Sequence, residues 1–103
     1  MSPAQVLATL NAKLIGLVGR DKQIGHAYFM RDGEQIRSVS EFKTVFETDI
    51  IPLIQDYCFD DYGRLAEIIG QGFVDVENMT INTEIFEGPE DAFIAEIEKT
   101  FRE

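Results

Sequence analysis

The chain has 103 residues and a mass of 11.7 kDa, a length that allows one domain at most. Its composition, 45% hydrophobic and 27% charged, is that of a globular protein and excludes a disordered or low-complexity polymer. No apolar run approaches the roughly 20 residues of a membrane span, and the N-terminus lacks a signal-peptide pattern, so we expect a cytoplasmic protein. The single cysteine, Cys58, cannot form an intrachain disulfide.

The net charge of −10 is concentrated in the second half of the chain. Residues 1–52 carry six basic and six acidic side chains, whereas residues 53–103 carry three basic and thirteen acidic ones. Nucleic-acid affinity depends on Lys and Arg that neutralise phosphates, so this balance argues against direct DNA or RNA binding. The acidic half is either a solvated face or a site for a basic partner.

The first expected helix covers about residues 3–18. Ser2 and Pro3 supply a cap and a first-turn proline, and Gly19 supplies a stop. The apolar residues that recur at helical spacing are Val6, Leu7, Leu10, Leu14, Leu17 and Val18. A polar loop follows over residues 20–25. The apolar run 27–30 is too short to assign, and Asp32 with Gly33 is a turn signal.

Three helices are expected between residues 38 and 70. Ser38 and Glu41 have capping-box spacing, Thr48 and Asp49 resemble the next start, and Asp60 or Asp61 can cap a third helix that Gly70 ends. The middle helix has Pro52 in its opening turn and is apolar on most sides, so it should supply the core. The predicted core residues are Ile50, Ile51, Leu53 and Ile54, packed by Phe42, Phe46, Leu14 and Leu65.

After Gly72 the apolar spacing changes from 3.6 to 2 residues, which predicts short strands between residues 73 and 86. Gly88 and Pro89, followed by two acidic residues, then begin a last helix. Its buried stripe is predicted to be Phe93, Ile94, Ile97 and Phe101. We therefore predict a mainly α (α+β) fold of about five helices with a small β-hairpin or three-stranded sheet.

The sequence carries no strong catalytic, nucleotide or metal motif. It has neither a GxxxxGK[ST] phosphate loop nor a dinucleotide fingerprint, and one histidine with one cysteine is too few for a zinc site. Cys58 and His26 could form a nucleophilic pair, but a thiol at the end of an apolar helix is usually packed and unreactive. Asp60 and Asp61 could be an acid–base pair, although such residues at a helix start more often cap it. We assign no catalytic residue, metal ligand or cofactor to this chain.

Two runs resemble a known family. They are LNAKLIGLVGRDKQIGHAYFM, residues 10–30, and FKTVFETDIIPLIQDYCFDDYGRL, residues 42–65. They are similar to the C-terminal part of the GTP-binding AAA+ subunit of McrBC-type, 5-methylcytosine-specific restriction systems, where an LN-x-R/K-I helix leads into GRD-x-x-IGHSYF and later into F-x-x-I-I-P-L-L-Q-E-Y. The likeness covers about residues 6–70. The departures are conservative: Ala27, Asp56 and Cys58 stand where serine, glutamate and an aromatic residue are common.

The resemblance implies that residues 1–103 are a single lid domain from a larger protein whose nucleotide-binding core is missing here. Such a lid packs over the nucleotide on its own core, contacts a neighbouring ring subunit and passes nucleotide state to ring geometry by rigid-body motion. GTP or ATP, with Mg, would bind the parent core. By analogy with other AAA+ lids, Gly25, His26 and Arg31 would face the nucleotide.

The family also implies the partners and leaves two alternatives. The ring hydrolyses GTP to move DNA and recruits a separate, McrC-like endonuclease subunit, so this chain would contact DNA only indirectly and no membrane. The first alternative is a freestanding acidic adaptor that binds a basic protein. The second is a small hydrolase that uses His26 and Cys58.

Overall fold

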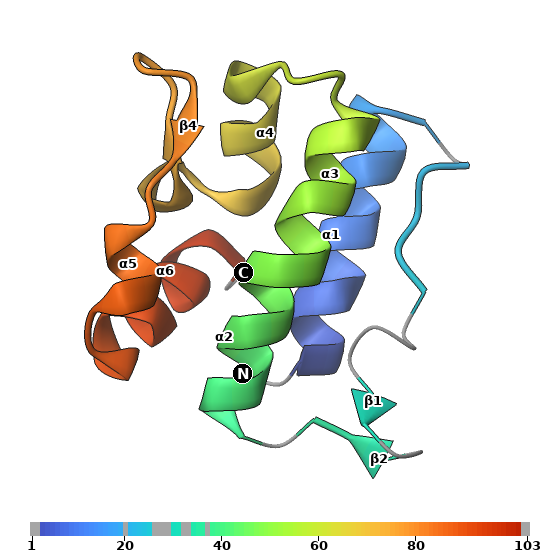
Figure 1. Cartoon of the computed structure of the whole chain (residues 1–103). Coiled ribbons are helices and arrows are strands. Elements are labelled where there is room, and N and C mark those ends of the chain that lie inside the picture. Colours follow the sequence, from blue (N-terminus) through green and yellow to red (C-terminus); the bar gives the residue numbers. More distant parts are fainter. Residues whose placement is uncertain (1–2, 20, 26–29, 32–33, 37, 102–103) are drawn as a thin grey trace.

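The computed structural model describes residues 3–19, 21–25, 30–31, 34–36 and 38–101 (Figure 1). The elements along the chain are α1 (Pro3–Leu17), β1 (Met30–Arg31), β2 (Glu34–Gln35), α2 (Val39–Val45), the π-helix η2 (Phe46–Ile50), α3 (Ile51–Tyr57), α4 (Tyr62–Ile69), the 3-10 helix η3 (Gln71–Phe73), β3 (Val74–Asp75), β4 (Thr80–Ile81), α5 (Glu84–Glu87) and α6 (Glu90–Phe101). The predicted mainly helical fold is confirmed.

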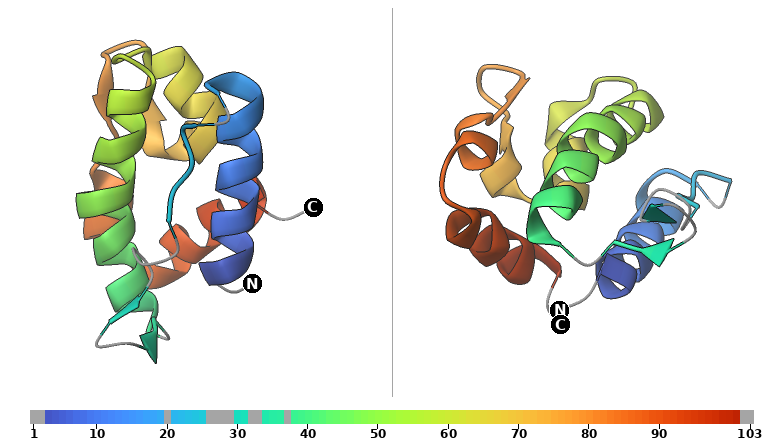
Figure 2. Two further views of the ribbon diagram at one scale, coloured as in Figure 1. Left: turned by 90° about the vertical axis from the view of Figure 1, so that its right-hand side faces the viewer. Right: turned by 60° about the horizontal axis from the view of Figure 1, so that its bottom comes forward.

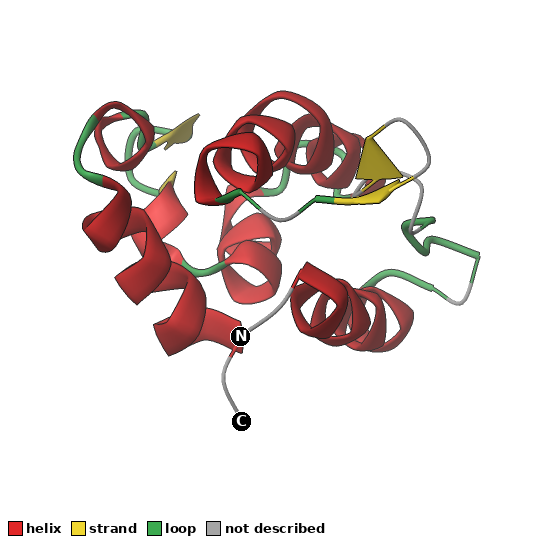
Figure 3. Cartoon of the chain, turned by 90° about the horizontal axis from the view of Figure 1, so that it is seen from below, coloured by secondary structure: helices red, strands yellow, loops and turns green. Residues whose placement is uncertain are grey.

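The segments α2, η2 and α3 join into one rod along the molecule, and the other helices pack around it (Figure 1). Helix α1 lies along one side of the rod, and α4 contacts both α1 and α3. Helix α5 and the β3–β4 hairpin lie on the other side of the rod from α1 (Figures 1 and 3). Helix α6 closes the base by contacting α1 and α2. The core therefore lies between α1, the rod and the C-terminal elements.

The predicted start at Ser38 is confirmed, because its hydroxyl accepts a hydrogen bond from the Glu41 N–H at 3.1 Å. The predicted second start at Thr48 is wrong: the Thr48 hydroxyl donates to the Thr44 carbonyl at 2.8 Å, inside a continuous helix. The chain passes from α2 to α3 through the wider π-turn, in which the Ile51 N–H bonds to the Phe46 carbonyl. Pro52 follows at once and lacks an N–H, so a local departure from α-helical bonding is expected there.

Both sheets in the described residues are two-stranded and antiparallel. Strands β3 and β4 pair Val74 with Ile81, which confirms the predicted hairpin. The predicted strand character around residues 85–86 is wrong, because Glu84–Glu87 form α5, with the Phe86 N–H bonded to the Thr83 carbonyl at 3.0 Å. The helical turn places Phe86 in the core. The sequence left the run 27–30 unassigned. Of these residues the structure describes Met30, which begins β1 and pairs with Gln35 of β2.

Six buried phenylalanines form one cluster with Phe46 at its centre. Its ring centroid lies between 5.3 and 6.5 Å from five others, those of Phe42, Phe73, Phe86, Phe93 and Phe101. Their rings are mostly tilted or edge-on, which suits the charge distribution of aromatic faces and edges. Four of these partners come from the chain after residue 70, so the C-terminal elements complete a core that begins in the rod.

The aliphatic core matches the prediction closely. The rod buries Ile50, Ile51 and Ile54 almost completely, while Leu53 is half-buried against the same cluster. Leu14 from α1 and Leu65 from α4 are also buried. The last helix buries Phe93, Ile97 and Phe101 as expected and half-buries Ile94.

Helix α6 packs tightly against the turn after α4. A Cβ placed on Gly70 would overlap the Thr100 hydroxyl, and one on Gly72 would overlap the Glu96 carboxylate. Gly70 also has φ +112, a conformation that side chains with a Cβ rarely adopt. Gly70 therefore needs glycine, because its backbone conformation and the short Thr100 side chain both exclude a Cβ, whereas at Gly72 the flexible end of Glu96 could move aside.

We predict that Ile54→Ala lowers the thermal unfolding midpoint strongly. Ile54 is fully buried, and truncating such a side chain costs about 2–5 kcal/mol. For a domain of this size the midpoint should fall by roughly 10 °C or more in circular dichroism melts. The matched control is Ile15→Ala on α1, where the side chain is 38% exposed and the loss should be small. Equal melting of the two variants would contradict the assigned core.

A second pair of variants tests the α6 packing. Gly70→Ala should destabilise the fold by at least about 1–2 kcal/mol, because the left-handed backbone strains any side chain and Thr100 must move. Gly16→Ala should raise stability by up to about 1 kcal/mol, because Gly16 lies within α1 and an added Cβ meets nothing within 4 Å. Chemical denaturation gives the change in the free energy of unfolding for each variant. An unchanged free energy of unfolding in Gly70→Ala would contradict the close packing of α6 against this turn.

Candidate functional site

The segment that links α1 to β1 is the candidate site, because it leads to the residues singled out by the sequence. Its described part, residues 18–19 and 21–25, is here called the α1 loop. Figure 2 (left) shows the loop leaving the end of α1 and crossing in front of the space between α1 and the rod, on the side that Figure 1 draws at the right. Three sets of contacts hold it there.

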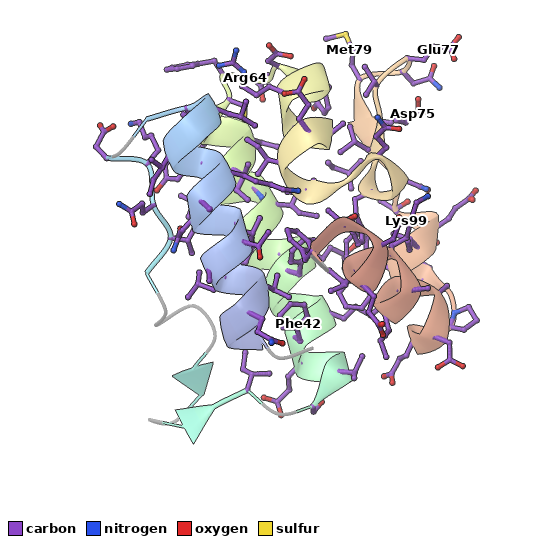
Figure 4. The ribbon with its side chains drawn as sticks, turned by 180° about the vertical axis from the view of Figure 1, so that it is seen from behind. Phe42, Arg64, Asp75, Glu77, Met79 and Lys99 are labelled. Carbon is purple, nitrogen blue, oxygen red and sulfur yellow. The ribbon has the colours of Figure 1, made fainter. Side chains whose placement is uncertain are left out.

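The first contacts fix the end of α1. The N–H groups of Val18 and Gly19 both donate to the Leu14 carbonyl at 2.9 Å, and Gly19 has φ +151. The Arg64 guanidinium of α4 donates from Nη1 to the Leu17 carbonyl at 2.8 Å. A cation at a helix C-terminus satisfies a free carbonyl and interacts favourably with the helix dipole. Figure 4 shows Arg64 at this end of the molecule. The start of the loop is therefore tied to α4.

The second contact joins the loop to α3. The Lys22 ammonium lies 5.5 Å from the centre of the Tyr57 ring and 4.0 Å from the Asp21 carboxylate. Its main-chain N–H donates to the Gly19 carbonyl at 3.1 Å. A partly exposed cation–π contact contributes about 0.5–1 kcal/mol, so this contact is a modest restraint.

The third set is the most specific. The Asn11 side chain, in the middle of α1, binds both main-chain groups of Ile24: its Oδ1 accepts from the Ile24 N–H at 2.7 Å, and its Nδ2 donates to the Ile24 carbonyl at 3.1 Å. The Ile24 side chain is only 3% exposed and belongs to the hydrophobic core. Ile24 is thus held by its side chain and by both of its main-chain polar groups.

Of the three residues that the sequence proposed to face a nucleotide, Gly25 is fully described. Gly25 directly follows the clamped Ile24, is exposed, and could carry a Cβ that meets no described atom within 4 Å. Packing within the described chain therefore does not require glycine there. His26 lies outside the described residues, and for Arg31 only the main chain is described, within β1. The proposal for these two side chains stays a prediction.

Sequence reasoning did not single out Asn11 or Arg64. A signal for Asn11 exists, because it lies in a helix beside the predicted core positions Leu10 and Leu14, where an amide needs a partner. Its partner, thirteen residues away, could not be identified without the tertiary structure.

The other sequence candidates have structural roles. Cys58 is buried, and burial is the main cause that raises the pKa of its thiol, so it is a weak nucleophile. Asp61 caps α4 by accepting from the Arg64 N–H at 3.1 Å, as predicted for Asp60 or Asp61. Within the described ranges, no group of three or more His, Cys, Asp or Glu could hold a metal ion.

Lys13 connects α1 with two other helices. Its ammonium donates to the Ile68 carbonyl of α4 at 3.3 Å and lies 5.0 Å from the centre of the Phe101 ring of α6. Burial lowers the pKa of Lys13 below its usual value. Lys13 and Asn11 therefore lie two residues apart on α1, one holding the C-terminal helices and the other the loop.

One end of the molecule exposes apolar side chains among acidic ones. Phe59, in the α3–α4 turn, is 88% exposed, and Met79, in the β3–β4 turn, is 64% exposed; both have positive φ. Figure 4 shows Met79 beside Glu77 at the end of the molecule where Arg64 lies.

No helix in the described part of the chain has both the length and the apolar character to cross a membrane.

Comparisons with known proteins identify the family. No curated protein and no solved structure matched the chain. A family model described as the McrB alpha-helical lid domain matches residues 2–66, which is more than half of the chain. The match includes α1, the α1 loop and the rod, and it ends within α4. The chain therefore belongs to the McrB alpha-helical lid domain family.

Proposed function

We propose that this chain is the lid of a McrB-like, GTP-dependent AAA+ subunit of a modification-dependent restriction endonuclease. In this role it couples nucleotide state to ring assembly and DNA translocation. The observation that carries the proposal is the family match over residues 2–66, which includes the α1 loop and its two anchoring elements, α1 and the rod.

The architecture supports movement of the lid as one body. The rod shares its phenylalanine cluster with η3, α5 and α6, and Lys13 links α1 to α4 and α6. The Asn11 clamp then holds the α1 loop to the same body. A displacement imposed at the loop would therefore reach the whole domain, as rigid-body coupling requires.

The proposal places the nucleotide on the parent core. This chain has no phosphate-binding loop with its lysine, so GTP or ATP and Mg are held by the core. Gly25, His26 and Arg31 are the residues proposed to face the nucleotide from the lid side. The proposed partners are that core, neighbouring ring subunits and an McrC-like endonuclease subunit, with DNA contacted only indirectly.

A second function, an acidic adaptor, has one observation in its favour. The exposed apolar side chains of Phe59 and Met79 lie at an end that also carries exposed acidic residues, including Asp60 and Glu77. A basic protein surface with an apolar centre would complement it. A Walker motif upstream in the same reading frame would favour the lid, and a separately expressed 103-residue product would favour the adaptor.

We predict that the isolated chain neither binds nor hydrolyses GTP or ATP. Titration calorimetry with each Mg-nucleotide up to about 1 mM should give only heats of dilution, because the sequence lacks the GxxxxGK[ST] motif of a phosphate-cradling loop. The matched positive control is the longer protein that contains the core. A micromolar dissociation constant for the isolated chain would contradict a lid without its own nucleotide site.

We further predict that His26→Ala in the longer protein lowers nucleotide turnover while the isolated lid keeps its melting midpoint within a few degrees. The lid proposal requires this result because His26 is assigned to the nucleotide side and not to the core. Steady-state GTP hydrolysis and circular dichroism melts measure the two effects. A large loss of stability, with activity falling in proportion to folded protein, would instead make His26 a structural residue.

A further inference from the structure

The α1 loop ends at a fixed point, Ile24. Its buried side chain resists displacement of the residue from the core, and the two hydrogen bonds from Asn11 resist rotation of its main chain. Gly25 follows and is exposed. The Asn11–Ile24 pair therefore sets the place and the direction in which the chain continues into residue 25.

The two hydrogen bonds to Ile24 use both the oxygen and the nitrogen of the asparagine amide. One acceptor and one donor side by side on a short side chain match the N–H and carbonyl of a single residue, and both bonds are partly buried. An aspartate could keep the bond to the Ile24 N–H but would place a carboxylate oxygen against the Ile24 carbonyl. An alanine would leave both main-chain groups without this partner.

The packing of the helices against one another depends less on Asn11 than the position of the α1 loop does. On α1 the core is supplied by Val6, Leu10 and Leu14, all almost fully buried, whereas Asn11 is only half-buried. Lys13 makes directed side-chain contacts from α1 to the Ile68 carbonyl of α4 and the Phe101 ring of α6, and the described bonds of Asn11 go to the loop. Loss of the Asn11 amide should therefore loosen the main chain at Ile24 and leave the packing between helices in place.

We propose that Asn11 is a positioning residue for nucleotide turnover: by clamping Ile24 it fixes the point at which the chain enters Gly25, the first of the three residues proposed to face the nucleotide. This inference rests on the lid function proposed above. Asn11 itself touches no nucleotide in this scheme. Its effect is geometric, and displacement of reacting groups by about 1 Å can cost about a hundredfold in rate.

The test compares Asn11→Ala and Asn11→Asp with Lys43→Met. Lys43→Met is the control, because it removes a different hydrogen bond from a side chain to the main chain. In that bond the Lys43 ammonium of α2 donates to the carbonyl of Gly88, at the end of α5, at 3.2 Å. Hydrogen exchange of the Ile24 amide is measured in the 103-residue chain. GTP hydrolysis is measured in the longer protein, below the melting transition of every variant, with His26→Ala alongside.

We expect Ile24 exchange to accelerate in Asn11→Ala and to be unchanged in Lys43→Met. Turnover should fall at least about tenfold in Asn11→Ala, less in Asn11→Asp, and not in Lys43→Met. The loss should appear in kcat, with KM for GTP changed by no more than about twofold, because the lid then misplaces groups without removing the core's nucleotide site. A merely structural role would lower the folded fraction and leave kcat per folded molecule unchanged.

Two results would overturn the inference alone. The first is an unchanged exchange rate of the Ile24 amide in Asn11→Ala. The second is faster Ile24 exchange in Asn11→Ala with turnover equal to that of Lys43→Met, while His26→Ala still lowers turnover. In both cases the lid function stands. If neither His26→Ala nor Asn11→Ala affects turnover, or if the longer protein hydrolyses no GTP, the proposed function fails and the inference fails with it.

Discussion

The packing of phenylalanine rings around Phe46 is the constraint on which the rest of the structure depends. This one side chain, at the start of the π-turn, is fully buried and contacts aromatic rings from α2, η3, α5 and α6. Most of its partners follow residue 66, where the family match ends. The C-terminal third is therefore part of the same hydrophobic core, and the matched segment could not bury its own central ring without it.

The π-turn and the close α6 packing follow from the same constraint. The rod presents Phe46 and Ile50 to one core although Pro52 removes a helical hydrogen-bond donor directly after them. The wider turn keeps the rod continuous through this point. On the opposite side, the absence of a Cβ at Gly70 lets Thr100 of α6 lie against the chain, and the same helix supplies Phe93 and Phe101 to the cluster.

The proposed function depends on polar contacts made by α1, in addition to its apolar packing. One face of this helix supplies leucines to the core, while Lys13 and Asn11 make directed bonds to main-chain carbonyl and N–H groups elsewhere. Lys13 joins the helices to one another, and Asn11 joins the loop to the helices. A lid that moves as one body and carries a loop of fixed position needs both kinds of contact. Family membership and this geometry together support the coupling role proposed for the domain.

The sequence by itself determined the helical class, most helix limits, the Ser38 cap, the start of α4 at Asp60 or Asp61, the core aliphatics and the family. These follow from local rules, since periodicity, caps and motifs are read within a few residues. Tertiary structure decided the rest: Thr48 lies inside a continuous rod, residues 84–87 are helical because Phe86 belongs to the aromatic cluster, and β1 pairs with β2. It also decided that Asn11 binds Ile24 and that Arg64 caps α1, because both bonds join groups far apart in the chain, and only packing brings such groups together.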